Sequence, residues 1–384
     1  MAQPKPFTVN IAEEVLDDLG SRLARTRWPE PLPGSGWAYG VDLDYLRELV
    51  DYWRGAFDWR AQERWLNTFP QFTTELDGQT VHFVHQRGRG PRPLPLVLTH
   101  GWPSSYVELL KLVPLLTDPA AHGGDHNDSF DVVVPSLPGY AFSGRPPRPG
   151  LVTARRMADL WARLLRDCLG YARFGAQGQD IGAAVSVSLA AQHPELVVGI
   201  HLPGVLTFPP QDRPLSQEGH AFLARQQRFR DDEAGYAHQQ GTYPQTLAYG
   251  LTDSPAGLAA WIVDKFRAWS DGDGDVERRF SKDELLTTVT IYWVTGSINS
   301  SFLFYYFYYD SRHDPEPPQA VHVDVPVGVA LFPKENPVTG PREWAEQTYN
   351  IARWTKMPRG GHFPAAEEPE LLAAELQAFF RPLR

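Results

Sequence analysis

Apolar residues in the first part of the chain recur at the spacing of an α-helix. Every fourth position from Ile11 to Leu23 is apolar, and Asn10 stands directly before this stretch. The pattern predicts an amphipathic helix that the Asn10 side chain caps. A second apolar stripe of helical spacing follows at residues 46–53. We therefore expect residues 1–75 to form an N-terminal helical extension.

The hydrophobic period changes after this segment. Apolar and polar residues alternate from Thr80 to His85, and short apolar runs occupy residues 94–99 and 132–134, which predicts three strands. Thr153 then begins an amphipathic helix that ends at Gly170. Strands that alternate with helices are typical of a mostly parallel sheet with helices on both faces. The sequence therefore predicts an α/β fold.

The alternation of strands and helices is interrupted late in the chain. Residues 206–320 are rich in Gln, Tyr, Trp and Phe, after which a strand pattern at 325–332 and an amphipathic helix at 371–380 resume the alternation. The simplest account is a mostly helical insertion at 206–320 within an α/β core. That core then comprises residues 76–205 and 321–384.

Composition and charge exclude several classes of protein. Hydrophobic residues make up 42% of the chain and charged residues 21%, which argues against a disordered or fibrous protein. The 36 Lys and Arg against 46 Asp and Glu give a net charge of −10, so we expect no nucleic-acid partner and no membrane partner. The single cysteine, Cys168, excludes an internal disulfide. Because we find neither a signal-like start nor an apolar stretch of about 18 residues, we expect a cytoplasmic location.

Candidate chemistry begins at a Gly-Gln-Asp-Ile-Gly sequence at 178–182, which lies between a strand-like and a helical stretch. This is the arrangement of a nucleophile elbow, in which glycines two positions before and after the nucleophile permit a sharp turn. The elbow residue is Asp180. A carboxylate at a helix N-terminus is held ionised and suits a nucleophile that attacks carbon. The motif by itself also fits a surface turn in which Asp180 only caps the helix.

A His-Gly-Trp-Pro sequence at 100–103 follows the apolar strand that ends at Thr99. In an α/β-hydrolase sheet, the loop after this strand and the residue after the nucleophile each supply a backbone N–H group to the oxyanion hole. This assigns the hole to the N–H groups of Trp102 and Ile181. We expect His100 to shape the loop and not to act as the catalytic base. The alternative interpretation of the His-Gly-Trp-Pro sequence is an ordinary tight turn.

A Gly-Gly-His sequence at 360–362 precedes the last helix. The order nucleophile, acid, histidine predicts that His362 is the catalytic base. The acid should follow a late strand, which favours Glu335 over the earlier Asp324. A solvated surface position for Glu335 is the alternative, and Asp212 is then the next candidate acid.

Together these motifs resemble an epoxide hydrolase of the α/β-hydrolase superfamily. The resemblance is to the branch with an N-terminal helical extension, which includes microsomal, juvenile-hormone, fungal and bacterial enzymes, and it covers nearly the whole chain. The Arg-Trp-Pro sequence at 27–29 resembles the extension, and the sequence at 135–143 resembles the second small-residue motif of the family. The sequence Trp-Ile-Val-Asp-Lys-Phe at 261–266 resembles the cap. An α/β-hydrolase fold with a helical cap is therefore implied.

The family uses two cap tyrosines to donate hydrogen bonds to the epoxide oxygen. Tyr236, in a Gly-Tyr-Ala sequence, matches the first of them, and Tyr305, after a Ser-Ser-Phe-Leu-Phe sequence, matches the second. The chain departs from the family pattern because residues 302–309 are all aromatic except one, and such a run is also typical of a core. The aromatic cap, with Trp102 and Phe304 as substrate-binding residues, favours bulky apolar or aryl epoxides.

The resemblance implies a complete reaction. Asp180 attacks an epoxide carbon, the tyrosines stabilise the alkoxide, and water activated by His362 hydrolyses the resulting ester to a vicinal diol. No metal and no organic cofactor is required, the epoxide and water are the small-molecule partners, and a homodimer is left open.

Two alternatives to this reaction stay open. A haloalkane dehalogenase shares the Asp nucleophile but usually has Trp where this chain has Ile181. The other is a non-catalytic α/β-hydrolase scaffold that binds an apolar ligand or a partner. A serine esterase is disfavoured because the chain contains no Gly-x-Ser-x-Gly sequence.

Overall fold

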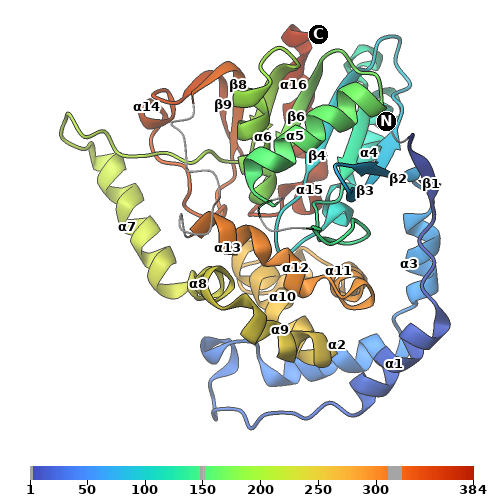
Figure 1. The fold of residues 1–384 in the computed structure, drawn as a ribbon. Helices are drawn as coiled ribbons and strands as arrows, with labels where there is room; N and C mark the ends of the chain where they lie inside the picture. Colours follow the sequence, from blue (N-terminus) through green and yellow to red (C-terminus); the bar gives the residue numbers. More distant parts are fainter. Residues whose placement is uncertain (1–2, 148–149, 151, 310–321) are drawn as a thin grey trace.

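A computed structural model gives the fold of residues 3–147, 150, 152–309 and 322–384. An α/β core forms one half of the molecule, a layer of cap helices lies beside it, and the N-terminal segment runs along the outside of the cap (Figure 1). The predicted boundary between cap and core at residues 320 and 321 lies outside the described residues.

Parallel strands predominate in the core sheet. Within the described part of the chain the strand order is β1-β2-β3-β5-β4-β6-β7-β8-β9, and β1, β2 and β3 make the antiparallel pairings. Strand β4 has β5 on one side and β6 on the other, both parallel to it. The chain therefore changes direction across the sheet at β4, which is where open α/β sheets bind their ligands. The strands are β1 (Lys5–Phe7), β2 (Gln71–Leu76), β3 (Gln79–Gln86), β4 (Leu94–Thr99), β5 (Phe130–Pro135), β6 (Phe174–Gly178), β7 (Val197–Leu202), β8 (Val323–Leu331) and β9 (Tyr349–Lys356).

Helices cover both faces of the sheet, as predicted. Helices α5 (Ala154–Arg163) and α6 (Ile181–Gln192) pack together on one face, and α4 (Leu112–Thr117) and α16 (Pro369–Phe380) pack on the other (Figure 1). Every residue of β5 is buried as a result, because a strand covered on both faces has no solvent side. Shorter core elements are η2 (Tyr106–Leu109), η3 (Pro119–His122), η4 (His126–Asp128), η5 (Leu164–Cys168), α14 (Arg342–Ala345), α15 (Pro364–Glu367) and η7 (Arg381–Leu383).

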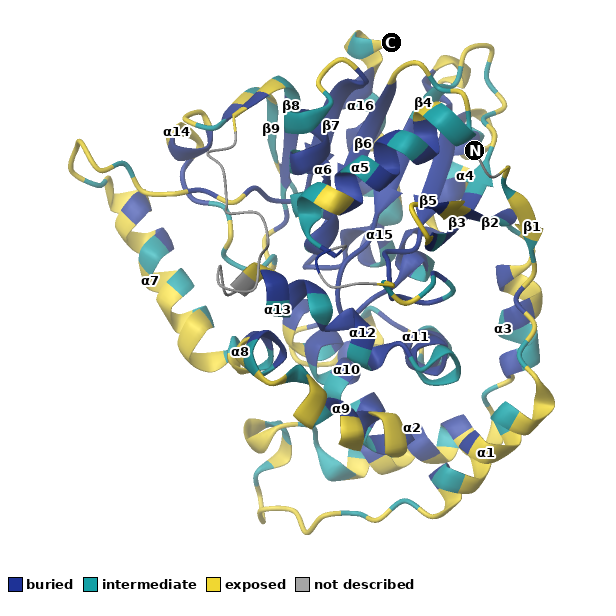
Figure 2. Ribbon diagram, in the orientation of Figure 1, coloured by how far each residue is buried: buried dark blue, intermediate teal, exposed yellow. Residues whose placement is uncertain are grey.

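The insertion forms a helical cap, as predicted. Its inner helices are largely buried between the core and the N-terminal segment, whereas its first helix, α7, projects outward and is mostly exposed (Figure 2). The cap elements are α7 (Gln217–Asp232), α8 (Gly235–Thr242), α9 (Pro244–Asp253), α10 (Pro255–Trp269), η6 (Val276–Arg278), α11 (Lys282–Thr295), α12 (Ile298–Ser301) and α13 (Leu303–Tyr309). None of the helices in the described ranges is long and apolar enough to serve as a membrane span.

The N-terminal segment is helical but also contributes to the sheet. Strand β1 pairs with β2. All of β1 and all of β2 except its last residue lie within residues 1–75, so the sheet begins within the segment that the sequence predicts as helical. The helices α1 and α2 contact α10 of the cap, so this segment covers the cap from outside. The helical elements are α1 (Glu13–Ala24), η1 (Gly36–Tyr39), α2 (Leu43–Gly55) and α3 (Trp59–Leu66).

The predicted cap of the first helix is wrong. Helix α1 begins at Glu13, after Ala12, and no side chain caps it. The backbone before α1 is hydrogen-bonded to side chains in α3 and directly after it. Asn67 accepts a hydrogen bond from the Val9 N–H group at 2.8 Å, and Glu63 accepts one from the Ile11 N–H group at 2.7 Å. These tertiary contacts hold the chain extended through residue 11, so Asn10 lies outside the helix.

Candidate active site

Asp180 lies at the sharp turn between β6 and α6. Its backbone has φ 52° and ψ −121°, a strained conformation for a residue with a side chain. A Cβ atom on Gly178 would collide with the carbonyl oxygen of Gly182, and one on Gly182 would collide with that of Thr99. Both glycines are therefore required for the turn, which presents the Asp180 side chain at the carboxyl end of the sheet.

Backbone N–H groups hold the Asp180 carboxylate in place. The Trp102 N–H group donates to Asp180 Oδ1 at 2.9 Å, and the Ile181 N–H group also hydrogen-bonds to the carboxylate. Gly101 lies so close that a Cβ atom there would overlap the Asp180 side chain. The two N–H groups predicted for the oxyanion hole therefore converge on Asp180, and Oδ2 is left to face the rest of the site.

His362 lies between Asp180 and Glu335. Its Nδ1 atom is 2.6 Å from Glu335 Oε1, and its Nε2 atom is 3.7 Å from Asp180 Oδ2. Glu335 is on the loop after β8, and His362 is on the loop after β9. The backbone N–H group of His362 donates a hydrogen bond to the backbone carbonyl oxygen of Trp269 at 2.9 Å. Because Glu335 is the acceptor at Nδ1, the ring nitrogen that faces Asp180 is Nε2.

Burial and nearby charges shift the pKa values of this group in opposite ways. Burial lowers the pKa of His362, but the charges of Glu335 and Asp180 and the hydrogen bond to Glu335 outweigh it and raise the pKa to about 9. Burial raises the pKa of Asp180, against the lowering effect of His362 and the two N–H groups. At neutral pH His362 is therefore protonated, and its imidazolium lies between Asp180 and Glu335.

The two predicted tyrosines meet at the Trp102 ring. Tyr236 stacks on Trp102 with ring centroids 5.1 Å apart and planes at 7°, and Tyr305 meets Trp102 edge-on at 6.0 Å. The Tyr236 and Tyr305 rings are 5.8 Å apart. Trp102 belongs to the loop after β4, so these rings bring cap residues of α8 and α13 directly over the loop that donates to Asp180.

The structure thus brings together Asp180, His362, Glu335, Tyr236 and Tyr305 with the N–H groups of Trp102 and Ile181, and their catalytic roles stay predictions. Phe304 is buried, and its ring contacts Tyr305 and Tyr308. From the same aromatic run, Phe302 as well as Tyr305 contacts the Trp102 ring. The alternative acids, Asp212 and Asp324, are both exposed.

Sequence analysis missed two cap residues beside the tyrosines. The Trp269 ring lies 4.9 Å from the Tyr236 ring and 5.1 Å from the His362 ring. Lys265 Nζ lies 5.7 Å from the ring centres of both Tyr236 and Trp269. Both residues are on α10. The cap motif at 261–266 contains Lys265 but not Trp269, so the sequence carried a signal for the lysine alone.

The chain is similar to known proteins over nearly its whole length. Residues 4–109 match the family model described as "Epoxide hydrolase N terminus", and residues 95–252 match "alpha/beta hydrolase fold". A Stigmatella aurantiaca protein provisionally named as an epoxide hydrolase is 45% identical over 99% of this chain and 85% of its own length. Epoxide hydrolase 1 of Oryctolagus cuniculus is 37% identical over 98% of this chain and 88% of its own length.

A solved structure extends the similarity to three dimensions. The Aspergillus niger epoxide hydrolase superimposes with a TM-score of 0.87 and 31% sequence identity, over all of this chain and 97% of that one. The predicted fold and the predicted family are thereby confirmed. The chain belongs to the epoxide hydrolases of the α/β-hydrolase superfamily that carry an N-terminal extension.

Proposed function

We propose that the protein converts a bulky apolar or aryl epoxide to a vicinal diol through an ester on Asp180. The observation that carries the proposal is the asymmetry of the Asp180 carboxylate. Oδ1 accepts the Trp102 N–H group at 2.9 Å, while Oδ2 lies 3.7 Å from His362 Nε2. A carboxylate held in this way has one oxygen available to attack carbon and one already in an oxyanion hole.

In the first step, Asp180 Oδ2 forms a bond to an epoxide carbon as the strained C–O bond breaks. Tyr236 and Tyr305 donate hydrogen bonds to the departing oxygen, because a neutral phenol can supply a proton near pH 7. Lys265 Nζ lies 5.7 Å from the centre of the Tyr236 ring. Its positive charge stabilises the negative charge that develops on Tyr236 as the phenol gives up its proton. The product of this step is an alkyl-enzyme ester.

In the second step, His362 takes a proton from water that attacks the ester carbonyl carbon of Asp180. Esterification removes the Asp180 charge, which is one of the causes that raise the pKa of His362 to about 9. The first step therefore lowers the pKa of the histidine and makes a base available for the second. The oxyanion forms at Oδ1, where the N–H groups of Trp102 and Ile181 stabilise it.

The rings around the reacting atoms support a bulky apolar or aryl substrate. The Trp102 ring contacts the rings of Phe302, Trp269 and both tyrosines, and the Trp102 backbone N–H group donates to Asp180. Aromatic surroundings of this kind favour apolar and aromatic groups. The cytoplasmic location and the homodimer stay predictions.

Trapping of the ester tests the proposal. The His362→Gln variant should react with styrene oxide and stop at the ester, because the base acts only in the second step. Mass spectrometry should locate the adduct on the peptide that contains Asp180, and Asp180→Asn should give none. An adduct on a different residue, or none in a His362→Gln variant that still binds substrate, would contradict the mechanism. Turnover of chloroalkanes in place of epoxides would favour the dehalogenase.

A further inference from the structure

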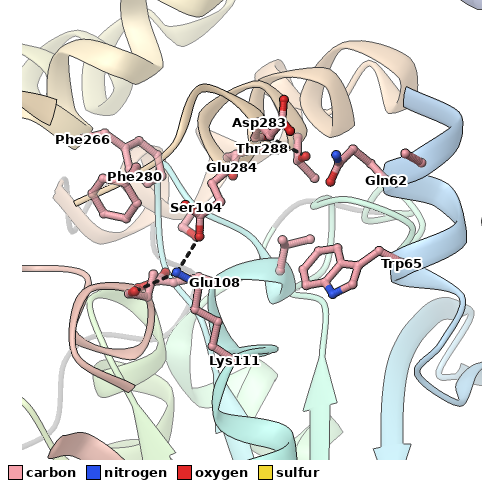
Figure 3. Close-up of a pocket in the computed structure, with 14 residues that line it drawn as sticks. Gln62, Trp65, Ser104, Glu108, Lys111, Phe266, Phe280, Asp283, Glu284 and Thr288 are labelled. Carbon is pink, nitrogen blue, oxygen red and sulfur yellow. Dashed lines mark hydrogen bonds and ion pairs between the residues drawn. The ribbon is translucent and has the colours of Figure 1, made fainter. Parts of the chain in front are cut away.

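A cavity of about 380 Å³ lies where the N-terminal segment, the cap and the core meet. Its walls come from α3, α11 and the chain that follows β4 into η2 (Figure 3). It is separate from the aromatic cluster of Trp102, Tyr236 and Tyr305, since none of these residues lines it. Its wall includes Ala61, Ser104, Glu108, Lys111, Asp283 and Glu284.

The outer side of this cavity is held by an ion pair between core and cap. Lys111 Nζ lies 2.5 Å from Glu284 Oε1 and donates to the Ala366 carbonyl oxygen at 3.1 Å (Figure 3). Lys111 and Glu284 are each more than one third exposed, so this side of the cavity is in contact with solvent.

The inner side of the cavity reaches the residues beside the catalytic group. Glu108 is buried there, and it hydrogen-bonds to the Ser104 hydroxyl and to the side-chain amide of Gln179, the residue before Asp180. The other side-chain atom of that amide, Gln179 Oε1, is buried and has no hydrogen-bond partner within the described residues. A buried acceptor of this kind normally binds water.

Two residues of the cavity wall contact the residue that follows His362. Phe266 and Phe280 line the cavity, and both contact the ring of Phe363, the residue after His362, at centroid distances of 4.4 and 5.8 Å. Burial raises the pKa of Glu108 to about 8, a shift that the charge of His362 reduces and that of Asp180 increases. Glu108 can therefore exchange a proton near neutral pH, which an ordinary glutamate does not do.

We propose that this cavity supplies the hydrolytic water to His362 and that Glu108 relays protons between the site and the cavity. The inference rests on the proposed Asp180 ester. Before hydrolysis, His362 gives up its imidazolium proton, which Glu108 receives through water as its own proton passes to the cavity. The tyrosinate left by ring opening takes a proton from water. In ester hydrolysis the water O–H bond breaks, its oxygen bonds to the Asp180 carbonyl carbon, and its proton goes to His362. When the ester C–O bond breaks, the departing diol oxygen takes the proton of the carboxylic acid left on Asp180, so the site returns to imidazolium and carboxylate and protons balance.

Single-turnover kinetics test the relay, with ester formation and ester decay measured separately. Glu108→Gln keeps the size of the side chain and an acceptor for Gln179 but cannot exchange a proton. We expect ester decay to slow by about tenfold or more, with ester formation within about twofold of the wild type. Asp283→Asn, which removes a different carboxylate from the same cavity wall, should leave both rates unchanged.

Chemical rescue separates a proton relay from a structural role. In Glu108→Ala, formate is small enough to enter the cavity and should restore ester decay in proportion to its concentration. Adding Ala61→Trp, which narrows the cavity from α3, should abolish the rescue, whereas Ala61→Ser should not. Ala61→Trp alone should slow ester decay, and this variant tests the entrance even if the Glu108 variants do not fold.

Each outcome separates this inference from the proposed function. Absence of any ester in the wild type would contradict the Asp180 mechanism itself. An ester that forms and decays at the wild-type rate in Glu108→Gln would overturn the relay. Slow decay in Glu108→Ala without formate rescue would show that Glu108 only positions Gln179, and it would also overturn the relay.

Discussion

At the scale of the residue, the two oxygens of the Asp180 carboxylate have different surroundings. The N–H group of Trp102 fixes Oδ1, and the imidazole of His362 faces Oδ2. The backbone of Gly101 also packs closely against the Asp180 side chain, so the carboxylate is held by a close contact as well as by a hydrogen bond. The same residue can therefore present a nucleophile in one step and a carbonyl in an oxyanion hole in the next.

The tyrosine pair gives the first prediction. Tyr236→Phe or Tyr305→Phe removes one hydrogen bond made mainly in the transition state, so each should slow ring opening by roughly ten- to a thousand-fold with little change in substrate binding. The double variant should be almost inactive, because the alkoxide would develop without a donor. Rapid-mixing measurement of ester formation checks this.

Tyr306→Phe is the matched control for the pair, because it lies one residue away on α13 and points to a different side of the helix. Its ester formation should equal that of the wild type. A damaging Tyr306→Phe together with a silent Tyr305→Phe would show that the second donor is assigned to the wrong residue of the aromatic run.

Glu335 gives the second prediction. In Glu335→Gln, the amide still accepts a hydrogen bond from His362 but cannot stabilise the imidazolium by charge, so ester decay should slow more than ester formation. Asp212→Asn, which changes an exposed carboxylate, should match the wild type. An unchanged time course for Glu335→Gln would transfer the role of acid to another carboxylate.

Most residues that the structure brings together at this site occur in local motifs, which is why the sequence could name them; their catalytic roles stay predictions. The elbow glycines, the His-Gly-Trp-Pro loop and the glycines before His362 are each fixed by backbone geometry, which leaves a mark on nearby sequence. Glu108 and Lys265 leave no such mark. Their surroundings come from chain segments far apart in sequence, so their roles depend on packing that a single sequence does not reveal.

At the scale of the element, the site is made by loops at the carboxyl ends of parallel strands and closed by cap helices. Strands β4, β6, β8 and β9 each end at a loop that carries one part of it. Apolar runs and turn residues predicted β4, β6 and β8, whereas β9 was not predicted. The cap of the first helix was predicted wrongly. Asn67 and Glu63 accept hydrogen bonds from the backbone N–H groups of Val9 and Ile11, so the helix begins after Asn10 and not at it.

Helix α10 gives the third prediction. It places Lys265 beside the Tyr236 ring and the Trp269 carbonyl oxygen against the His362 N–H group. Lys265→Met keeps the length of the side chain but removes its charge, so ring opening should slow by about two- to thirtyfold. Ester decay should change little. Lys356→Met, at an exposed position on β9, is the control, and an equal effect of both variants would refute a local role for Lys265.

At the scale of the whole molecule, core and cap meet around buried titratable groups, and this gives the fourth prediction. The pKa of His362 is about 9 in the folded protein against 6.5 for an ordinary histidine. Its contribution to folding stability is therefore fully present below about pH 6.5 and is lost as the pH rises through 9. Glu108 has a pKa of about 8 instead of 4.5, so it also lowers the folding stability as the pH rises, between about pH 4.5 and 8.

Urea denaturation at several pH values measures this dependence. The free energy of unfolding should fall from pH 6.5 to 9 in the wild type and should fall less steeply in His362→Gln, whatever the absolute stability of that variant. Parallel curves for the two proteins would show that His362 does not gain its proton affinity from folding.

The most direct test of the central claim is one turnover in water labelled with heavy oxygen. Because water attacks the carbonyl carbon of the ester, the label should enter the Asp180 carboxylate, and the diol of that turnover should carry the former Asp180 oxygen. Mass spectrometry of the peptide that contains Asp180 and of the diol measures both. Label found only in the diol after one turnover would mean that water attacks the epoxide directly, and it would contradict the assignment of Asp180 as nucleophile.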